Sequence, residues 1–241
     1  MTATIHSIPG YGIWDNPASW SEERIPTSDD IVEINGTIAM NVSPTIAGLV
    51  INGGGELLGS YSSMVVNGDI ENHGTFSVTT LTISGTGTHI LDFHNNPFIG
   101  NIFLEGDISV LGDLNITGSF GLRGTTHNIH LEDGRGITAK AGFINGTIII
   151  SGTNTFLKTQ GYTHTFTVTG SLDHYIFDTK NTTQLASELY TYCSSISAKS
   201  IEITPGSSIY THPNCLEPTY TFNTEKLSIA SGATLNIPQN F

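Results

Sequence analysis

Apolar residues recur along this chain in triplets, in which two aliphatic or aromatic residues flank a middle residue. The triplets are Leu49-Val50-Ile51, Leu81-Thr82-Ile83, Ile102-Phe103-Leu104, Leu114-Asn115-Ile116, Ile129-His130-Leu131, Phe166-Thr167-Val168, Ile201-Glu202-Ile203, Leu227-Ser228-Ile229 and Leu235-Asn236-Ile237. Because strand side chains alternate between two faces, the outer residues of each triplet share one face and the middle residue takes the other. The pattern predicts short, half-buried strands.

A second phrase, an aliphatic residue followed by a polar residue and glycine, marks where many of these strands end. It occurs as Ile51-Asn52-Gly53, Val66-Asn67-Gly68, Ile83-Ser84-Gly85, Leu104-Glu105-Gly106, Ile116-Thr117-Gly118, Ile144-Asn145-Gly146, Ile150-Ser151-Gly152 and Val168-Thr169-Gly170. Glycine reaches positive φ without a steric penalty, so each phrase is typical of a strand that runs into a tight turn.

Short, self-similar strands broken by turns favour a solenoid, in which successive coils stack in register. We predict an all-β fold: a single-stranded, right-handed parallel β-helix, with its body over residues 31–241 and a cap over residues 1–30. A jelly roll or other β-sandwich is the alternative.

One stretch departs from the strand pattern. Residues 181–193, NTTQLASELYTYC, contain no glycine and place Leu185, Leu189 and Tyr192 at helical spacing after two candidate N-caps. We predict a short helical insertion near residues 181–195, with an irregular loop as the alternative.

Composition narrows the class of partner. Charged residues make up only 12% of the chain and the net charge is −13, so nucleic acid and anionic membranes are not expected partners. No apolar stretch approaches the roughly 20 residues that span a bilayer, so no membrane insertion is expected. The scattered acidic residues leave occasional calcium ligation open, and we expect no other cofactor.

The only two cysteines are Cys193 and Cys215. Such sparing use fits a secreted protein with one disulfide between them, and two buried thiols are the alternative. The opening residues MTATIHSIPGYG lack the basic start and apolar centre of a signal peptide. A virion protein, which needs no leader, is therefore the alternative to an extracellular or cell-surface protein.

The segment GIWDNPASWSEERIPTSDDIVEINGTIAMNV, residues 12–42, contains two tryptophans, a proline-threonine pair and two aspartates before alternating apolar residues. The positions that form this pattern are Trp14, Trp20, Ser21, Ile25, Pro26, Thr27, Asp29, Asp30, Ile31 and Val32. The pattern resembles the start of bacterial surface β-solenoid proteins and related glycine-rich G8-type domains, and the similarity continues to about residue 85 through GLVINGGGELLGS and MVVNGDIENHGTFSV. It departs from them at residues 22–24, where a glycine commonly precedes the proline.

The resemblance implies an extracellular, adhesive or structural module that is often part of a larger protein. The residues themselves agree, because Trp14 and Trp20 are large enough to cover the open end of a first coil. We predict a structural cap that includes Trp14, Trp20 and Asp30. Sugar stacking by one of the tryptophans is the alternative.

The histidines are the best place to look for chemistry. On a β-helix, side chains of neighbouring coils meet, so Asp92, His94, His130 and Glu132 form a candidate polar ligand face. His127 and His130 stand three residues apart on a predicted strand, which does not suit a metal site, and we predict none. No catalytic residue is assigned.

The chain is therefore predicted to be a non-enzymatic extracellular module that serves as a stalk, adhesin or assembly subunit. Its expected partners are neighbouring copies or domains, met by end or side contact, and glycans. A polysaccharide lyase or glycoside hydrolase on the same fold stays open, since two carboxylates on adjacent coils suffice for hydrolysis. So does a phage tail or spike component.

Overall fold

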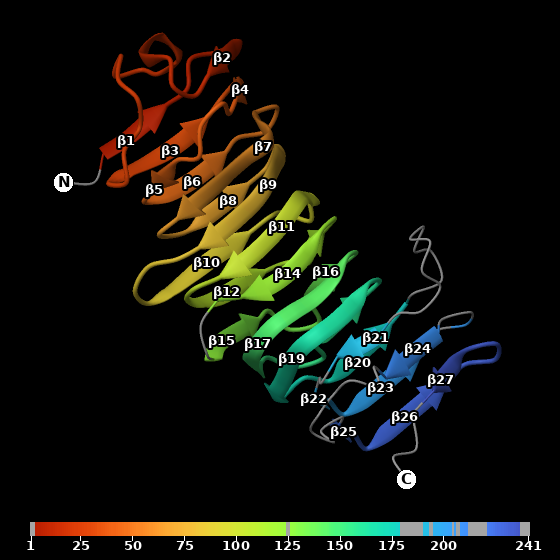
Figure 1. Cartoon of the computed structure of the whole chain (residues 1–241). Helices are drawn as coiled ribbons and strands as arrows, with labels where there is room; N and C mark the ends of the chain where they lie inside the picture. The colour runs from red at the N-terminus through yellow and green to blue at the C-terminus, as the bar shows by residue number, and fades with distance from the viewer. Residues whose placement is uncertain are drawn as a thin grey trace. The chain divides into compact units, whose positions relative to one another are not determined.

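The computed structural model describes residues 3–123, 126–178, 190–192, 195–203, 205, 208–211 and 221–236, which form β-strands, turns and one 3-10 segment (Figure 1). The strand pairs are parallel, with a single antiparallel bridge between Ser7 and Trp20 among the described residues. Parallel strands one coil apart are the pairing of a β-solenoid, and a sandwich would pair antiparallel hairpins instead. The predicted fold class is confirmed. The chain divides into two units, Met1–Thr117 and Gly118–Phe241.

The first unit contains strands β1 to β13 and the 3-10 segment η1 (Pro17–Ser19). The strands are β1 (Ala3–His6), β2 (Tyr11–Ile13), β3 (Asp30–Ile34), β4 (Thr37–Ala39), β5 (Thr45–Ile46), β6 (Gly48–Ile51), β7 (Glu56–Val66), β8 (Ile70–Asn72), β9 (Thr75–Ile83), β10 (Thr88–Asp92), β11 (Phe98–Leu104), β12 (Asp107–Leu111) and β13 (Leu114–Ile116). Strands β3, β6, β8 and β10 lie side by side (Figure 1). Leu49 pairs with Ile70 and Ile70 with Leu91, so two successive coils there have the same length.

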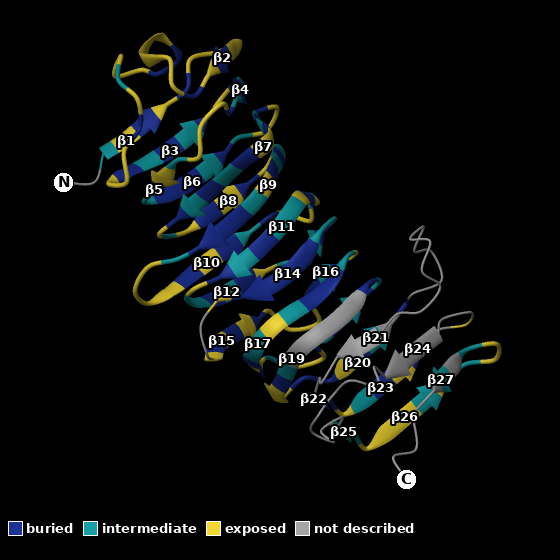
Figure 2. Ribbon diagram, viewed as in Figure 1, coloured by how far each residue is buried: buried dark blue, intermediate teal, exposed yellow. Residues whose placement is uncertain are grey.

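The interior of the first unit is apolar, as the triplet pattern predicts. Leu49 and Ile51 are at most 1% exposed, whereas Val50 between them faces outward and is partly exposed. Figure 2 shows buried and intermediate residues along β3 and β6. Phe76, with Phe93 and Phe98 near it, adds an aromatic cluster with ring centroids 5.0–6.3 Å apart.

The first coils begin inside the segment predicted to be a cap. β1 and β2, both before residue 30, already pair in parallel with β3 and β4. Trp14 and Trp20 are buried beside them and meet edge to face at a centroid distance of 5.0 Å. The indole Nε1 of Trp20 donates a hydrogen bond of 2.9 Å to the carbonyl oxygen of Trp14.

The second unit contains strands β14 to β27. They are β14 (Ser119–Leu122), β15 (Thr126–Leu131), β16 (Gly136–Ala139), β17 (Gly142–Ser151), β18 (Phe156–Thr159), β19 (Tyr162–Gly170), β20 (His174–Phe177), β21 (Tyr190–Tyr192), β22 (Ser195–Ser197), β23 (Ser200–Ile203), β24 (Ser208–Thr211), β25 (Thr221–Asn223), β26 (Lys226–Ile229) and β27 (Thr234–Asn236). The coils lengthen along the unit: Phe143 pairs with Thr163, whereas Ile201 pairs with Leu227, which is further along the chain.

The predicted helical insertion is wrong where the structure describes it. Tyr190–Tyr192 is strand β21 and pairs in parallel with β19 and β24, because the period-two alternation of Tyr190-Thr191-Tyr192 outweighs the helical spacing of the apolar residues. Residues 181–189 of the predicted insertion lie outside the described residues, as do Cys193 and Cys215 with their predicted disulfide.

Several of the glycine phrases differ from the predicted turn, and Gly146 and Gly68 show two ways in which they do. Gly146 has φ +123 but lies inside β17, so the strand continues through it. Gly68 has no left-handed backbone; a Cβ there would lie 2.1 Å from the carbonyl oxygen of Ala47. At Gly68 the close approach of the preceding coil, rather than turn geometry, requires glycine.

Candidate functional site

An open groove of about 690 Å³ lies on the outer face of the first unit, over strands β3, β6, β8, β10 and β12. The residues that matter most for its chemistry are Ile31, Asp69, Glu71, His89, Ile90 and Asp92. The surface is mixed: Ile90 is 44% exposed, and carboxylates stand beside it. Apolar area with a few polar groups is the composition of a ligand-binding surface.

The register of the strands sets one row of outward-facing side chains along this face. Glu33 pairs with Val50, Val50 with Glu71, Glu71 with Asp92, and Asp92 with Leu111. Paired positions on neighbouring strands are about 4.8 Å apart. Glu71 and Asp92, which are far apart in sequence, are therefore neighbours.

His89 lies at the wall of the groove and is only 7% exposed. Its Nε2 is buried and has no hydrogen-bond partner within the part of the chain that the structure describes. The exposed positions Thr88 and Ile90 flank His89 on β10, so its side chain lies on the inner side of that strand.

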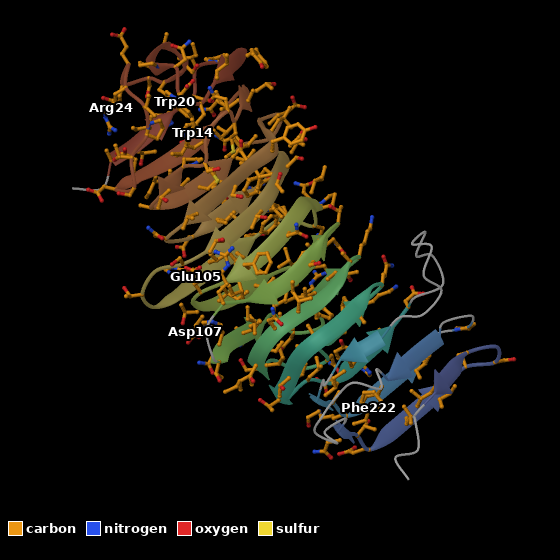
Figure 3. The ribbon with its side chains drawn as sticks, in the orientation of Figure 1. Trp14, Trp20, Arg24, Glu105, Asp107 and Phe222 are labelled. Carbon is orange, nitrogen blue, oxygen red and sulfur yellow. The ribbon has the colours of Figure 1, made fainter. Side chains whose placement is uncertain are left out.

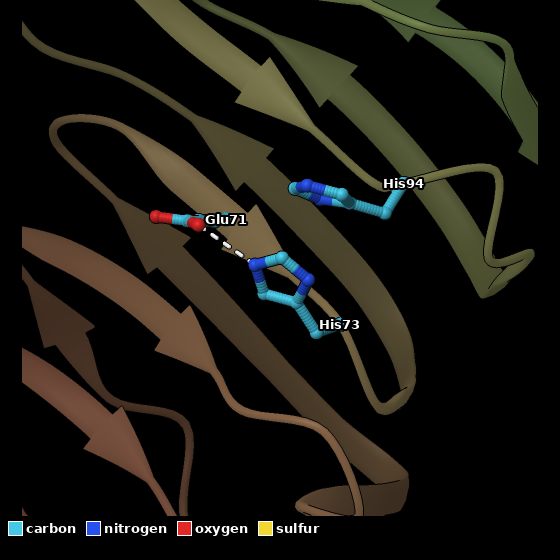
Figure 4. A group of neighbouring side chains, drawn as sticks. All are labelled: Glu71, His73 and His94. Carbon is cyan, nitrogen blue, oxygen red and sulfur yellow. Dashed lines mark hydrogen bonds and ion pairs between the residues drawn. The ribbon is translucent and has the colours of Figure 1, made fainter.

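A cluster of acidic and histidine side chains stands where β8 and β10 end (Figure 4). His73 Nε2 lies 2.7 Å from Glu71 Oε1, and His94 Nδ1 lies 3.0 Å from Asp92 Oδ1. The two imidazole rings overlap, with centroids 3.7 Å apart. We call Glu71, His73, His94 and Asp92 the acid–histidine cluster.

The four residues of the predicted ligand face belong to different units. Asp92 and His94 contact each other in the first unit. In the second unit, His130 Nδ1 lies 3.0 Å from Ser151 Oγ, and Glu132 forms a 3.8 Å ion pair with Arg135. Convergence of all four on one face stays a prediction.

His127 and His130 of β15 lie on opposite faces of their strand. His127 is buried at 9% exposure, whereas His130 is exposed, as period-two alternation requires. The geometry of β15 therefore does not bring these two imidazoles to one metal ion.

Asp30 forms the most strongly held charged contact at the start of the first unit. Arg24, labelled in Figure 3, donates two hydrogen bonds of 2.7 Å to the Asp30 carboxylate. The backbone N–H and the hydroxyl of Thr27 donate two more. The Arg24 guanidinium, together with the Thr27 donors, holds the pKa of the Asp30 carboxyl well below its usual range, although burial acts in the opposite direction.

Buried carboxylates with lysine partners also stabilise the second unit. Lys199 Nζ lies 2.5 Å from Asp173 Oδ1, and this contact lowers the pKa of the Asp173 carboxyl. Lys158 Nζ lies 2.7 Å from Asp178 Oδ2. Each pair joins neighbouring coils and has a structural role.

Sequence reasoning missed Glu71, His73 and His89. A signal for the first two exists, because Glu71-Asn72-His73 and Asp92-Phe93-His94 both follow an acid-x-His pattern. Glu71 pairs with Asp92, so the two motifs stand in register on successive coils and stack. A signal for His89 exists too, because the alternation of β10 places it on the inner face with Leu91.

No family model, curated protein or solved structure matches this chain. Within the residues that the structure describes, no helix has both the length and the apolar character needed to cross a bilayer. The function is therefore inferred from the groove and the acid–histidine cluster.

Proposed function

We propose that this chain is a non-enzymatic extracellular structural and adhesive module, in which the β-solenoid presents the groove of the first unit to a glycan. The groove over β3, β6, β8, β10 and β12 is the observation that carries the proposal, because stacked strands of successive coils contribute to one continuous surface. The resemblance of about residues 12–85 to surface β-solenoid proteins supports the same assignment.

The charge of the groove favours a neutral glycan. Among its described lining residues are Asp69, Glu71 and Asp92, and none is lysine or arginine. Carboxylates accept hydrogen bonds from sugar hydroxyls but repel the carboxylates of a uronate polymer. A lyase that neutralises a uronate with lysine or arginine side chains would not find them among these lining residues.

A glycan-array screen with the intact chain tests the proposal. We expect binding to neutral glycans, and at least about tenfold weaker binding after Ile90→Lys, which places a charge on the groove surface. Ile99→Lys is the matched control, because Ile99 is 45% exposed, close to the 44% of Ile90, and does not line the groove. Equal loss in both variants, or no binding to any glycan, would contradict the proposal.

Glycoside hydrolysis is the second candidate function, favoured by the pairing of Glu71 with Asp92 in the groove. Retaining glycosidases place two carboxyl groups about 5–5.5 Å apart, close to the spacing of neighbouring strands. Release of reducing sugar from the bound glycans, abolished by both Glu71→Gln and Asp92→Asn, would establish this function in place of simple adhesion.

We also propose that neighbouring copies of the chain stack at the β26 end of the second unit. Leu227 and Ile229 pair with Ile201 and Ile203, which are fully buried. Leu227 itself is 44% exposed and Ile229 49% exposed. A further strand in the same register, supplied by a second copy, would bury both and continue the apolar column.

A further inference from the structure

We propose that Glu71, His73 and His94 bind a divalent transition-metal ion, of which Zn²⁺ is the best fit. Each residue offers one ligand atom, and the three atoms lie within 4.8 Å of one another (Figure 4). Two imidazoles and one carboxylate are a common zinc ligand set, whereas calcium prefers oxygen ligands. The inference goes beyond glycan binding and does not depend on it.

The fold brings the two histidines together from neighbouring coils. His73 follows β8, and its backbone N–H donates a 2.7 Å hydrogen bond to the carbonyl oxygen of Ile51. His94 follows β10 in a turn closed by a 2.7 Å hydrogen bond from Asn96 N–H to the Phe93 carbonyl oxygen. This turn holds the His94 backbone at φ 47, which fixes the direction in which its side chain leaves the coil.

Asp92 supplies the outer contact of His94, which is a hydrogen bond to the ring nitrogen that does not bind the metal. Metal-binding histidines usually have such a contact. Asp92 Oδ1 lies 3.0 Å from His94 Nδ1 and also accepts the backbone N–H of His94 at 3.0 Å. A carboxylate that accepts the Nδ1 proton leaves the Nε2 lone pair for a metal and fixes the ring orientation. We assign Asp92 as a positioning residue.

The spacing of the ligand atoms suits a small tetrahedral ion. Metal–ligand distances of about 2.0–2.1 Å place tetrahedral ligands about 3.3 Å apart. In the structure His73 Nε2 lies 2.7 Å from Glu71 Oε1, and all three ligand atoms lie within 4.8 Å of one another. The side chains are 36–52% exposed, so small rotations can bring them to that spacing.

Three protein ligands leave a fourth position of a tetrahedral ion open. Glu71 and Asp92 also line the groove, so an ion held by the cluster would stand at the edge of the groove. The ion would join the coils that end in β8 and β10, and a hydroxyl of a bound partner could occupy the open position.

Calorimetric titration of the tag-free, chelator-treated chain with ZnCl₂ tests the site. We expect one tight Zn²⁺ per chain. His73→Ala and His94→Ala should each weaken binding at least about 100-fold, and Asp92→Asn about 10–100-fold as expected for an outer contact. Glu71→Gln, which changes the charge but not the size, should also weaken it.

His6→Ala is the matched control. His6 Nδ1 forms a 2.9 Å contact with Glu33, and its side chain is 46% exposed, but no third ligand joins the pair among the described residues. This variant should keep the wild-type affinity. Thermal unfolding in EDTA checks that every variant is folded. The proposal is overturned if the wild-type chain binds no Zn²⁺, or if folded His73→Ala and His94→Ala variants bind it as tightly as wild type.

Discussion

At the scale of single residues, the contact between Asp30 and Arg24 sets how the first unit responds to acid. The Asp30 carboxylate is buried at 2% exposure and receives hydrogen bonds from Arg24 and Thr27. These donors lower the pKa of the Asp30 carboxyl in the folded chain. In the unfolded chain this carboxyl has a pKa of about 3.9. As the pH falls, the unfolded chain therefore binds the proton before the folded chain does. The stabilisation is complete above that value and is lost as the pH falls through the folded-state pKa.

Asp30→Asn should therefore reduce the free energy of unfolding at pH 7 by about 1–3 kcal/mol. It should also flatten the fall in stability below about pH 4, because the titrating group is gone. Urea unfolding between pH 2 and 7, followed by the near-ultraviolet circular dichroism of the buried tryptophans, measures both effects.

Asp29→Asn serves as the control, since Asp29 is the adjacent carboxylate and is exposed. It should leave the unfolding free energy at pH 7 within about 0.5 kcal/mol of wild type. An unchanged acid response in Asp30→Asn, or an equal change in Asp29→Asn, would show that Asp30 does not hold this region together.

At the scale of elements, Gly100 fixes how β11 packs on β9. The register shifts between Ile99 and Asn101, and Gly100 has φ +144. A Cβ at this position would lie 1.8 Å from the carbonyl oxygen of Val78, a backbone atom that cannot move without shifting β9. Gly100→Ala should reduce the free energy of unfolding by about 2–4 kcal/mol.

Variants at two other glycines separate the two causes of the stability loss in Gly100→Ala, which are backbone strain and the clash with Val78. Gly87 has φ +98 but open space around it, so Gly87→Ala should cost about 1 kcal/mol for the backbone alone. Gly53 has neither positive φ nor a neighbour within 4 Å, so Gly53→Ala should be nearly neutral. Chemical denaturation ranks the three variants, and a loss for Gly100→Ala no larger than for Gly87→Ala would contradict the packing argument.

The alternation of apolar residues predicted most strands and their inward faces, although Leu227 and Ile229 of one predicted triplet are exposed. Leu49 and Ile51, and likewise Ile201 and Ile203, are buried around outward-facing middle residues. Alternation is a local property, so it does not depend on knowing which coil lies next. The same local reasoning fails at Gly68, where the neighbour is Ala47 of the preceding coil.

The candidate site depends on register, which local patterns do not contain. Asp92 and His94 were predicted as site residues, but Glu71 and His73 are recognised as their neighbours only once Glu71 is known to pair with Asp92. Coil length also changes within the second unit, where the coil that starts at β23 is longer than the one that starts at β17. A single repeat length therefore cannot align the whole chain, and stacked side chains are predictable only where the local coil length is known.

At the scale of the whole molecule, the apolar column at β26 predicts association. Full burial of an exposed aliphatic side chain contributes about 1.5–3 kcal/mol, and Leu227 and Ile229 are both about half exposed. A variant with both Leu227→Asp and Ile229→Asp should raise the dissociation constant between copies at least about tenfold. Sedimentation velocity over a range of protein concentrations measures it.

A double variant elsewhere controls for the added charge. Ile99→Asp and Ile149→Asp change apolar side chains that are 45% and 40% exposed on other strands. This variant should associate as the wild type does. A wild-type chain that stays monomeric at every concentration, or a control that dissociates equally, would rule out stacking at β26.

Hydrogen–deuterium exchange with and without the best-binding glycan from the array tests whether stacked coils build one binding surface. We expect slower exchange together in Gly48–Ile51, Ile70–Asn72 and Thr88–Asp92, which are separated in sequence but adjacent in the groove. Unchanged exchange in these three strands, with protection confined to the second unit, would show that the groove is not the binding surface.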